Sequence, residues 1–252
     1  MKTLTMKKFT FLFLTLIGLI SCSNDNINEI VKESQNQSEN YNFIYTVLSK
    51  DNSKDSVYRQ AYFIDNGRVI TEKYTNYNNS EYNHLSTFEY DNNGRIIKEV
   101  RENQIFTKIS WVNNAAKVFN KNNDLIGEFQ FNNSMQLISY KNGGQIRYLS
   151  YDSSGNVVSV ATEDGIYVEY LDYDTSKTNP LNLINSITIL RIDYSPHFKN
   201  VFKTEKAYPY KGDDFSVPLS FYKYSWTLNS KGLIETMTDE KTLIYTSKFE
   251  YN

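Results

Sequence analysis

Apolar and polar residues alternate along most of the chain from residue 42 to residue 252. In IFTKISWV (residues 105–112) and in FEYD (residues 88–91), apolar side chains return at every second position. Successive side chains of a β-strand point to opposite faces, so a period of two predicts strands with one buried face. No stretch of about twelve residues has a convincing apolar helical face. The pattern therefore predicts a single all-β domain over residues 42–252.

A repeated turn sequence joins the alternating stretches. FEYDNNGRII (residues 88–97) returns as FQFNNSMQLI (129–138), as LSYDSSGNVV (149–158) and in shortened form as TLNSKGLIE (227–235). An Asp or Asn side chain can cap such a turn, and a glycine three residues later supplies the left-handed backbone that leads into the next strand. Structural turn roles are accordingly expected for Asp91, Gly94, Asp152, Gly155 and Gly232.

Two copies of the repeat lack the glycine. Asn123 takes its position in VFNKNNDLI (residues 118–126), and asparagine adopts the left-handed conformation more readily than most residues with a side chain. Met135 takes it in FQFNNSMQLI, so we expect that turn to have another geometry. Tighter two-residue turns are expected at Asn66-Gly67, Asn142-Gly143 and Asp164-Gly165.

Runs between the turn signals predict an antiparallel meander of roughly 14–17 strands. So long a meander can protect its edges by closing into a barrel or by curling into a strongly bent, barrel-like sheet. Between residues 170 and 217 the pattern is looser, and we expect longer loops and one short helix near residues 181–186. The predicted strands are 42–50, 56–65, 68–76, 82–91, 95–103, 105–112, 115–120, 124–132, 135–141, 145–152, 156–162, 166–174, 184–194, 200–208, 219–229, 233–239 and 242–251.

Charges on the strands argue against a barrel that spans a membrane. We expect Arg95, Glu99 and Arg101 to share an outward face, and the lipid-facing band of a membrane barrel lacks such charges. The sequence therefore predicts a soluble barrel-like sheet rather than a membrane-spanning one.

The first residues form a targeting segment. Three lysines precede a continuous apolar run at residues 9–20, which has the length of a signal-peptide core and is too short to cross a bilayer as a helix. We therefore exclude residues 1–21 from the fold as a lipoprotein signal peptide. Their removal takes away three of the 27 basic residues and none of the 29 acidic ones, so the mature chain has a net charge of about −5. That balance excludes a basic surface for nucleic acid.

The segment LISC at the end of the apolar run resembles the lipobox of bacterial lipoproteins. In that motif the peptide bond before the cysteine is cut, and acyl chains on the cysteine anchor the protein with about 0.8 kcal/mol per buried methylene. This cysteine is the only one in the chain, so no intramolecular disulfide is expected. Residues 22–41 then form a lipidated, polar tether of an exported outer-membrane lipoprotein, on its periplasmic or its cell-surface face. The four motif positions are Leu19, Ile20, Ser21 and Cys22.

The sequence holds no recognisable catalytic or metal-binding motif. The histidines His84 and His197 stand far apart in polar segments, and we interpret them as surface residues. The acidic pair Asp213-Asp214 fits no calcium loop. A phosphate loop, a nucleophile elbow and a zinc-protease motif are all missing. We therefore expect no enzyme, no cofactor and no bound metal.

Aromatic residues are abundant, with 21 tyrosines and 15 phenylalanines. Alternating Tyr and Phe side chains are expected mainly to form the core of the sheet and its cross-strand pairs. Aromatic rings also stack on the apolar faces of sugars, so Trp111 and Trp226 are candidates for glycan stacking.

The lipobox, the polar tether and the Tyr-Asp-x-x-Gly units are joined by Asn179-Pro180, Lys199-Asn200 and a final aromatic strand at residues 249–251. Together they resemble a family of uncharacterised Bacteroidota lipoproteins with YD-like, Rhs-type repeats and a porin-like β fold. The resemblance covers most of residues 42–252 and implies a fold and a location, but no reaction. It also brings in a short O-glycosylation pattern, Asp-Ser-aliphatic, which makes Ser56 a candidate acceptor.

The sequence thus favours a lipid-anchored envelope protein with a non-catalytic binding or scaffolding role. A surface glycan-binding lipoprotein is the first alternative, and it predicts exposed Tyr or Trp side chains along one concave face. A carboxylate-based glycosidase is the second, and it requires two carboxylates about 5–10 Å apart in a cleft. The expected partners are a membrane, through the anchor, and either a glycan or an envelope protein, with no nucleic acid.

Overall fold

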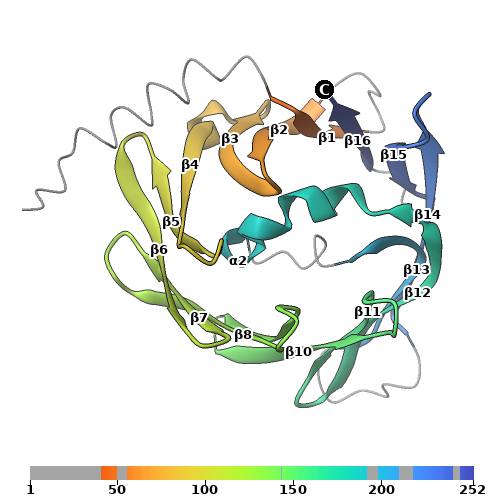
Figure 1. Cartoon of the computed structure of the whole chain (residues 1–252). Helices are drawn as coiled ribbons and strands as arrows, with labels where there is room; N and C mark the ends of the chain where they lie inside the picture. The colour runs from red at the N-terminus through yellow and green to blue at the C-terminus, as the bar shows by residue number, and fades with distance from the viewer. Residues whose placement is uncertain (1–40, 50–55, 143, 192–197, 210–217, 241–244) are drawn as a thin grey trace, which may run out of the picture.

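The computed structural model describes residues 41–49, 56–142, 144–191, 198–209, 218–240 and 245–252. In this part of the chain, sixteen strands form one closed antiparallel barrel (Figure 1). Each strand pairs with its neighbours in the sequence, and seven residue pairs between β1 and β16 close the ring. The strands are β1 (Phe43–Ser49), β2 (Ser56–Asp65), β3 (Arg68–Asn76), β4 (His84–Tyr90), β5 (Ile96–Arg101), β6 (Gln104–Val112), β7 (Ala115–Asn120), β8 (Leu125–Phe131), β9 (Leu137–Asn142), β10 (Gln145–Tyr151), β11 (Val157–Thr162), β12 (Gly165–Thr178), β13 (Asn200–Ala207), β14 (Ser220–Leu228), β15 (Ile234–Asp239) and β16 (Tyr245–Tyr251).

The alternating pattern located every one of these strands, and the expected all-β barrel is confirmed. The strand predicted at residues 184–194 is wrong in its described part. Those residues belong to the 3-10 helix η2 (Pro180–Ile187) and to the short α-helix α2 (Thr188–Arg191). The short helix expected near residues 181–186 lies within η2. Among the described residues, no helix has the length and apolar character needed to cross a bilayer.

The helical segment lies inside the barrel (Figure 1), and residues 180–191 are here named the plug. It begins where the Asn179 side chain accepts a hydrogen bond from the backbone N–H of Leu181, with a proline in the first turn. Ile184 and Ile187 are buried in the barrel core. A closed barrel has no free strand edge, so a chain inside it must satisfy its backbone hydrogen bonds within itself. This requirement favours a helix, although the β-branched residues of the segment suggest a strand.

The inside of the barrel is mainly apolar, and its outer face carries charged side chains. Inward-facing aliphatic and aromatic side chains from nearly all the strands make one continuous core with the plug. On the outer face, Lys98 pairs with Glu89 at 2.6 Å and Lys117 pairs with Glu128 at 3.3 Å, in each case across two neighbouring strands. A transmembrane barrel has the reverse arrangement, with an apolar band outside and a polar lumen. The wall of this barrel is therefore not built to face lipid.

The charged face predicted for β5 lies on the other side of the wall. Glu99 pairs across the sheet with Phe88 of the core, so it faces the lumen, where it is only 1% exposed. Arg101 forms an ion pair with it at 2.7 Å. Alternation separates the two faces of a strand, but it does not say which face points inward. A buried carboxylate is tolerated here because it has hydrogen-bonding partners.

Five connections of the barrel share one turn geometry. After β4, the carboxylate of Asp91 accepts backbone N–H bonds from Asn93 and Arg95, both at 2.9 Å, and Gly94 has a φ of +78°. Gly155 and Gly232 also have positive φ, at +86° and +75°. The side chains that make the equivalent pair of bonds in the other turns are those of Asn120, Asn132, Asp152 and Asn229.

The prediction of a different geometry at Met135 is wrong. Met135 has a φ of +58°, and its backbone N–H donates to the carbonyl of Asn132, as that of Gly94 does to Asp91. The Asn132 side chain holds this turn in the common geometry. A residue with a side chain is therefore held in the left-handed conformation, which costs roughly 1–2 kcal/mol.

Inward-facing aromatic residues beside shifts of strand register have a structural role that the repeat did not reveal. The Tyr151 hydroxyl, at the end of β10, donates to the backbone carbonyl of Leu137, the first residue of β9, at 2.7 Å. The strand register shifts beside Leu137, which interrupts the hydrogen-bond ladder and leaves the carbonyl in need of another donor. The same bond joins Tyr90 to Val69, Trp111 to Ile96, Tyr173 to Val157 and Tyr251 to Ile234.

We expect Met135→Gly to raise the free energy of unfolding by about 1 kcal/mol, because glycine adopts positive φ without strain. Gly232→Ala is the matched control. A Cβ at Gly232 meets no atom within 4 Å, so its cost of about 1 kcal/mol comes from the backbone alone. Chemical denaturation of both variants measures the two changes. A loss of stability in Met135→Gly would show that packing of the Met135 side chain outweighs the strain.

Removal of a single tyrosine hydroxyl tests the bonds to the shifted carbonyls. Tyr151→Phe is expected to lower the free energy of unfolding by about 1–2 kcal/mol, because the Leu137 carbonyl loses its donor in a partly buried place. Tyr148→Phe, on the same strand but 41% exposed, is expected to change it by less than about 0.5 kcal/mol. Equal effects of the two substitutions in urea denaturation would contradict this role.

Candidate functional site

The two ends of the barrel differ in construction. One end, here named the plug end, holds the start of β1, the end of β16 and both connections to the plug. There, the fully buried Asn156 side chain accepts the backbone N–H of Asn200 at 2.8 Å. The Asn200 side chain donates to the carbonyls of Thr175 and Lys177, both at 3.2 Å. These bonds fix the segment where the chain returns from the plug to the wall.

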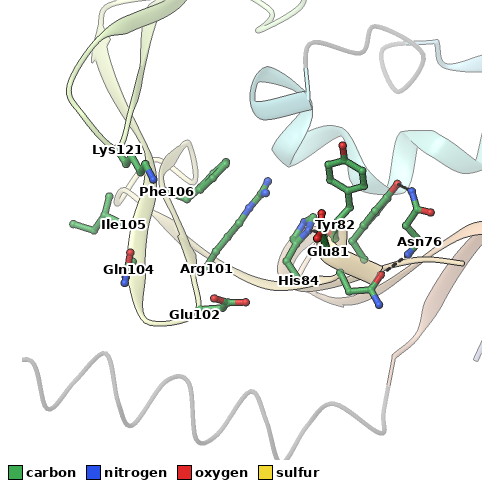
Figure 2. A pocket seen from close by; sticks show the side chains of 12 residues that line it. Asn76, Glu81, Tyr82, His84, Arg101, Glu102, Gln104, Ile105, Phe106 and Lys121 are labelled. Carbon is green, nitrogen blue, oxygen red and sulfur yellow. Dashed lines mark hydrogen bonds between the residues drawn. The ribbon is translucent and has the colours of Figure 1, made fainter. Parts of the chain in front are cut away.

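The opposite end, here named the mouth, carries a pocket of about 560 Å³ (Figure 2). This volume lies in the range of small-ligand sites, roughly 300–1,000 Å³. The mouth pocket is lined by the end of β3, the loop that contains the 3-10 helix η1 (Ser80–Tyr82), the turn between β5 and β6, and the residue after β7. Its lining therefore comes from segments that are separate in the sequence. Its aromatic side chains include Tyr74, Tyr82 and Phe106.

One wall of the pocket is a loop braced by asparagines. The Asn76 side chain accepts the backbone N–H groups of Asn78 and Asn79, and the backbone N–H of Asn76 donates to the Asn83 side chain at 2.6 Å. At the end of this loop, the ring of His84 stacks on Tyr74 with centroids 5.1 Å apart. His84 is thus a half-buried residue of the pocket, and the expectation of a surface histidine is corrected.

The facing wall presents a fixed guanidinium group. Arg101 donates to buried Glu99 at 2.7 Å, and its guanidinium carbon lies 3.6 Å from the ring centroid of Phe106. Glu99 also accepts the hydroxyls of Ser86 at 2.8 Å and Thr107 at 3.3 Å. Figure 2 shows Arg101 reaching into the space between Phe106 and His84. Since Glu99 and Phe106 both hold the guanidinium, its donors are oriented before any ligand arrives.

A row of aromatic rings leads from the core to the pocket. Phe249, Tyr45, Tyr58, Tyr74 and His84 lie on β16, β1, β2, β3 and β4, one ring on each strand. Neighbouring ring centroids are 5.1–5.9 Å apart, within the range of favourable aromatic pairs. The row supports Tyr74 and His84 from behind and keeps them in place.

The two tryptophans proposed for glycan stacking lie elsewhere. Trp111 is partly buried, donates its indole N–H to the Ile96 carbonyl at 2.7 Å and packs on Phe131. Trp226 is also partly buried, and Lys203 lies over its ring. Both pack against the barrel core, but their strands, β6 and β14, are on opposite sides of the sixteen-stranded ring.

The remaining residues predicted from the sequence do not line the mouth pocket or lie outside the described residues. Ser56 is the first residue of β2 and is not part of the pocket lining. The lipobox, His197 and Asp213-Asp214 lie outside the described residues. The lipobox positions concerned are Leu19, Ile20, Ser21 and Cys22.

Within the described residues, no group of three or more His, Cys, Asp or Glu is arranged to hold a metal ion. A carboxyl group in the lumen has a shifted pKa. Burial raises the pKa of Glu205 above its ordinary value of 4.5, and the negative charge of Asp239 adds to the rise. The hydrogen bond that Tyr224 donates to Glu205 at 3.0 Å acts in the opposite direction and is outweighed.

No family model and no curated protein matches the chain. Among solved structures, the barrel is similar to a porin-like protein from Bacteroides uniformis, with a TM-score of 0.48 and 10% identity over 84% of this chain and 98% of that one. A porin-like protein from Bacteroides vulgatus gives 0.38 and 10% identity, over 84% and 99% of the two chains. In the Photorhabdus luminescens Tc holotoxin pore, 81% of this chain matches only 9% of that chain, with a TM-score of 0.23. These likenesses carry nothing about a ligand or a reaction, and membership of the YD-repeat lipoprotein family stays a prediction.

The raised pKa of Glu205 predicts a pH dependence of stability. The folded protein binds this proton more tightly than the unfolded chain, so the group makes the free energy of unfolding fall as pH rises from 4.5 through the folded-state pKa. Glu205→Gln should remove that part of the decline, whereas exposed Glu163→Gln should leave it in place. Denaturation midpoints at intervals between pH 4 and pH 8 measure the slope, and identical slopes for Glu205→Gln and the native protein would refute the prediction.

Proposed function

We propose that this protein is a lipid-anchored envelope protein that binds a ligand in the mouth pocket and catalyses no reaction. The observation that carries the proposal is the mouth pocket itself. It combines a volume of about 560 Å³ with a lining of aromatic, amide and charged side chains from four segments. A pocket of this composition is the kind of concave site that takes small molecules or the end of a polymer.

The plug favours binding over passage through the barrel. Ile184, Ile187 and Ile189 of the plug belong to the same continuous core as the barrel wall. Ser186 of the plug accepts the backbone N–H of Val69 at 3.1 Å, and the Tyr90 hydroxyl lies 3.2 Å from it. A segment held by both apolar packing and hydrogen bonds is a fixed structural part of the lumen. It argues against free passage of a ligand through the barrel.

The position of the chain ends suits a membrane anchor. The first strand starts at the plug end, so an anchor at Cys22 would attach the barrel by that end. The mouth, at the opposite end, then lies away from the point of attachment. This arrangement supports a role in which an anchored barrel presents its pocket to soluble or polymeric ligands.

A carboxylate-based glycosidase is less well supported. The carboxylates that line the mouth pocket are those of Glu81 and Glu102, and both are exposed side chains on separate loops. Glycosidases place their two carboxyl groups on either side of the scissile bond, within a cleft. Product formation from a bound oligosaccharide, lost in Glu81→Gln or Glu102→Gln, would replace the binding proposal with this one.

The anchor can be tested separately from the pocket. Cys22→Ala is expected to release the protein from the membrane fraction, because the acyl chains that hold it there cannot be attached. Cell fractionation followed by immunoblotting measures the distribution, and protease treatment of intact cells reports which side the native protein faces. Ser23→Ala, at the next position, is the control and should stay in the membrane fraction. Membrane association that persists in Cys22→Ala would overturn the lipid anchor.

A further inference from the structure

The charged groups of the mouth pocket compensate one another. Its lining contains two cations, Arg101 and Lys121, and two anions, Glu81 and Glu102, so their formal charges sum to zero. Arg101 is also ion-paired with buried Glu99. With Glu99 counted, two positive and three negative groups lie at the pocket, so an anionic ligand would meet no excess of positive charge and would lose part of its hydration on entry. The electrostatics therefore favour an uncharged ligand over an anionic one.

The same pocket offers hydrogen-bonding groups at several points of its rim. Gln104 brings an exposed amide, Tyr82 brings an exposed hydroxyl, and Arg101 brings the N–H groups that Glu99 does not use. A wholly apolar ligand would cover these groups and leave them without partners, which costs affinity. The ligand that fits must therefore carry many donors and acceptors of its own.

Two of the rings in the lining are unusually open to solvent. Tyr82 is 62% exposed and Phe106 is 40% exposed, although both are large side chains in a concave part of the surface. Aromatic rings of this kind provide flat contact area at a small cost in conformational entropy. They suit a ligand that has apolar faces as well as polar edges.

From these three properties we propose that the mouth pocket binds a neutral oligosaccharide, an inference that rests on the proposed ligand-binding role of the mouth. A pyranose ring has no charge, carries hydroxyl groups around its edge and presents C–H groups on its faces. The hydroxyls pair with Gln104 and with the guanidinium of Arg101, and a C–H face lies on Tyr82, since Arg101 already covers one face of Phe106. Because Arg101 is already held by Glu99 and Phe106, little further ordering is needed on binding.

The test is calorimetric titration of the purified full-length protein, in detergent, with neutral oligosaccharides of glucose, xylose, mannose and galactose. At least one of them is expected to bind. Tyr82→Ala and Gln104→Ala should each raise its Kd by about tenfold or more, since each removes one of the two kinds of contact. Tyr148→Ala is the matched control, because Tyr148 is a tyrosine with 41% exposure that does not line the pocket. This variant should bind the oligosaccharide with the same Kd as the native protein.

Two further probe sets separate the ligand class from the binding role. Uronic-acid oligosaccharides and a dipeptide library are titrated against the native protein and against Tyr82→Ala. If one of these sets binds and Tyr82→Ala weakens it, while no neutral oligosaccharide binds, the saccharide inference falls and the ligand-binding mouth stands. If whatever binds does so equally well to Tyr82→Ala and Gln104→Ala, both fall. Absence of binding by every neutral oligosaccharide is sufficient to overturn the inference.

Discussion

The pairing of β1 with β16 closes the barrel and so creates its lumen. The two strands meet although residues in contact across this seam, such as Tyr45 and Ser247 with their hydroxyl oxygens 3.3 Å apart, are 202 positions apart in the sequence. Without this pairing, the meander would have two free strand edges. The rings of Phe43 and Phe249, which stack across it with centroids 6.3 Å apart, would no longer be in contact. Every other strand pair is local, so the entropy of closing the whole ring is concentrated in one contact. Strand pairing, the core and the plug are thus coupled to that single step.

Closure creates a second problem, because a ring of sixteen strands is wide. Eight strands already enclose a space that side chains can just fill, and diameter grows with strand number. Part of that extra space is taken by the protein's own chain, since residues 180–191, between β12 and β13, fold into the lumen as the plug. Ile184, Ile187 and Ile189 pack against the inward-facing side chains of the wall and complete the apolar core. The plug enters from one end, and the site that remains for a ligand lies at the other.

Local signals explain how much of this the sequence could predict. Strand positions follow from alternation, and the turns follow from the Asp or Asn that caps them. The errors at residues 184–194 and at Glu99 arise because alternation describes faces and periods but not surroundings. A β-branched run becomes helical when no strand edge is free to pair with it. The Glu99 carboxylate can face the lumen because Ser86, Arg101 and Thr107 donate hydrogen bonds to it there. In the turn that contains Met135, the hydrogen bonds accepted by the Asn132 side chain fix the common geometry, even though the usual glycine is absent.

The candidate site was beyond sequence reasoning for a different reason. Its lining comes from β3, η1, the β5–β6 turn and the residue after β7, none of which carries a motif. The sequence shows His84 only as a histidine in a polar segment, because its place against Tyr74 depends on the pairing of β3 with β4. A marker of the site was present in the sequence, namely exposed aromatic residues in loops, such as Tyr82. It could not be separated from the many tyrosines elsewhere in the chain.

The structure divides those aromatic residues by task, and the division decides how the abundance of tyrosine bears on function. Tyr90, Tyr151, Tyr173 and Tyr251 satisfy carbonyls at register shifts, a task that any barrel of such hairpins has, whatever it binds. Tyr45 and Tyr58 form the row behind the pocket. Among the tyrosines and phenylalanines of the described residues, those that line the pocket are Tyr74, Tyr82 and Phe106, so aromatic composition by itself says little about glycans. A case for a saccharide ligand has to rest on those rings together with Gln104 and Arg101, because these are the side chains that a ligand at the mouth can touch.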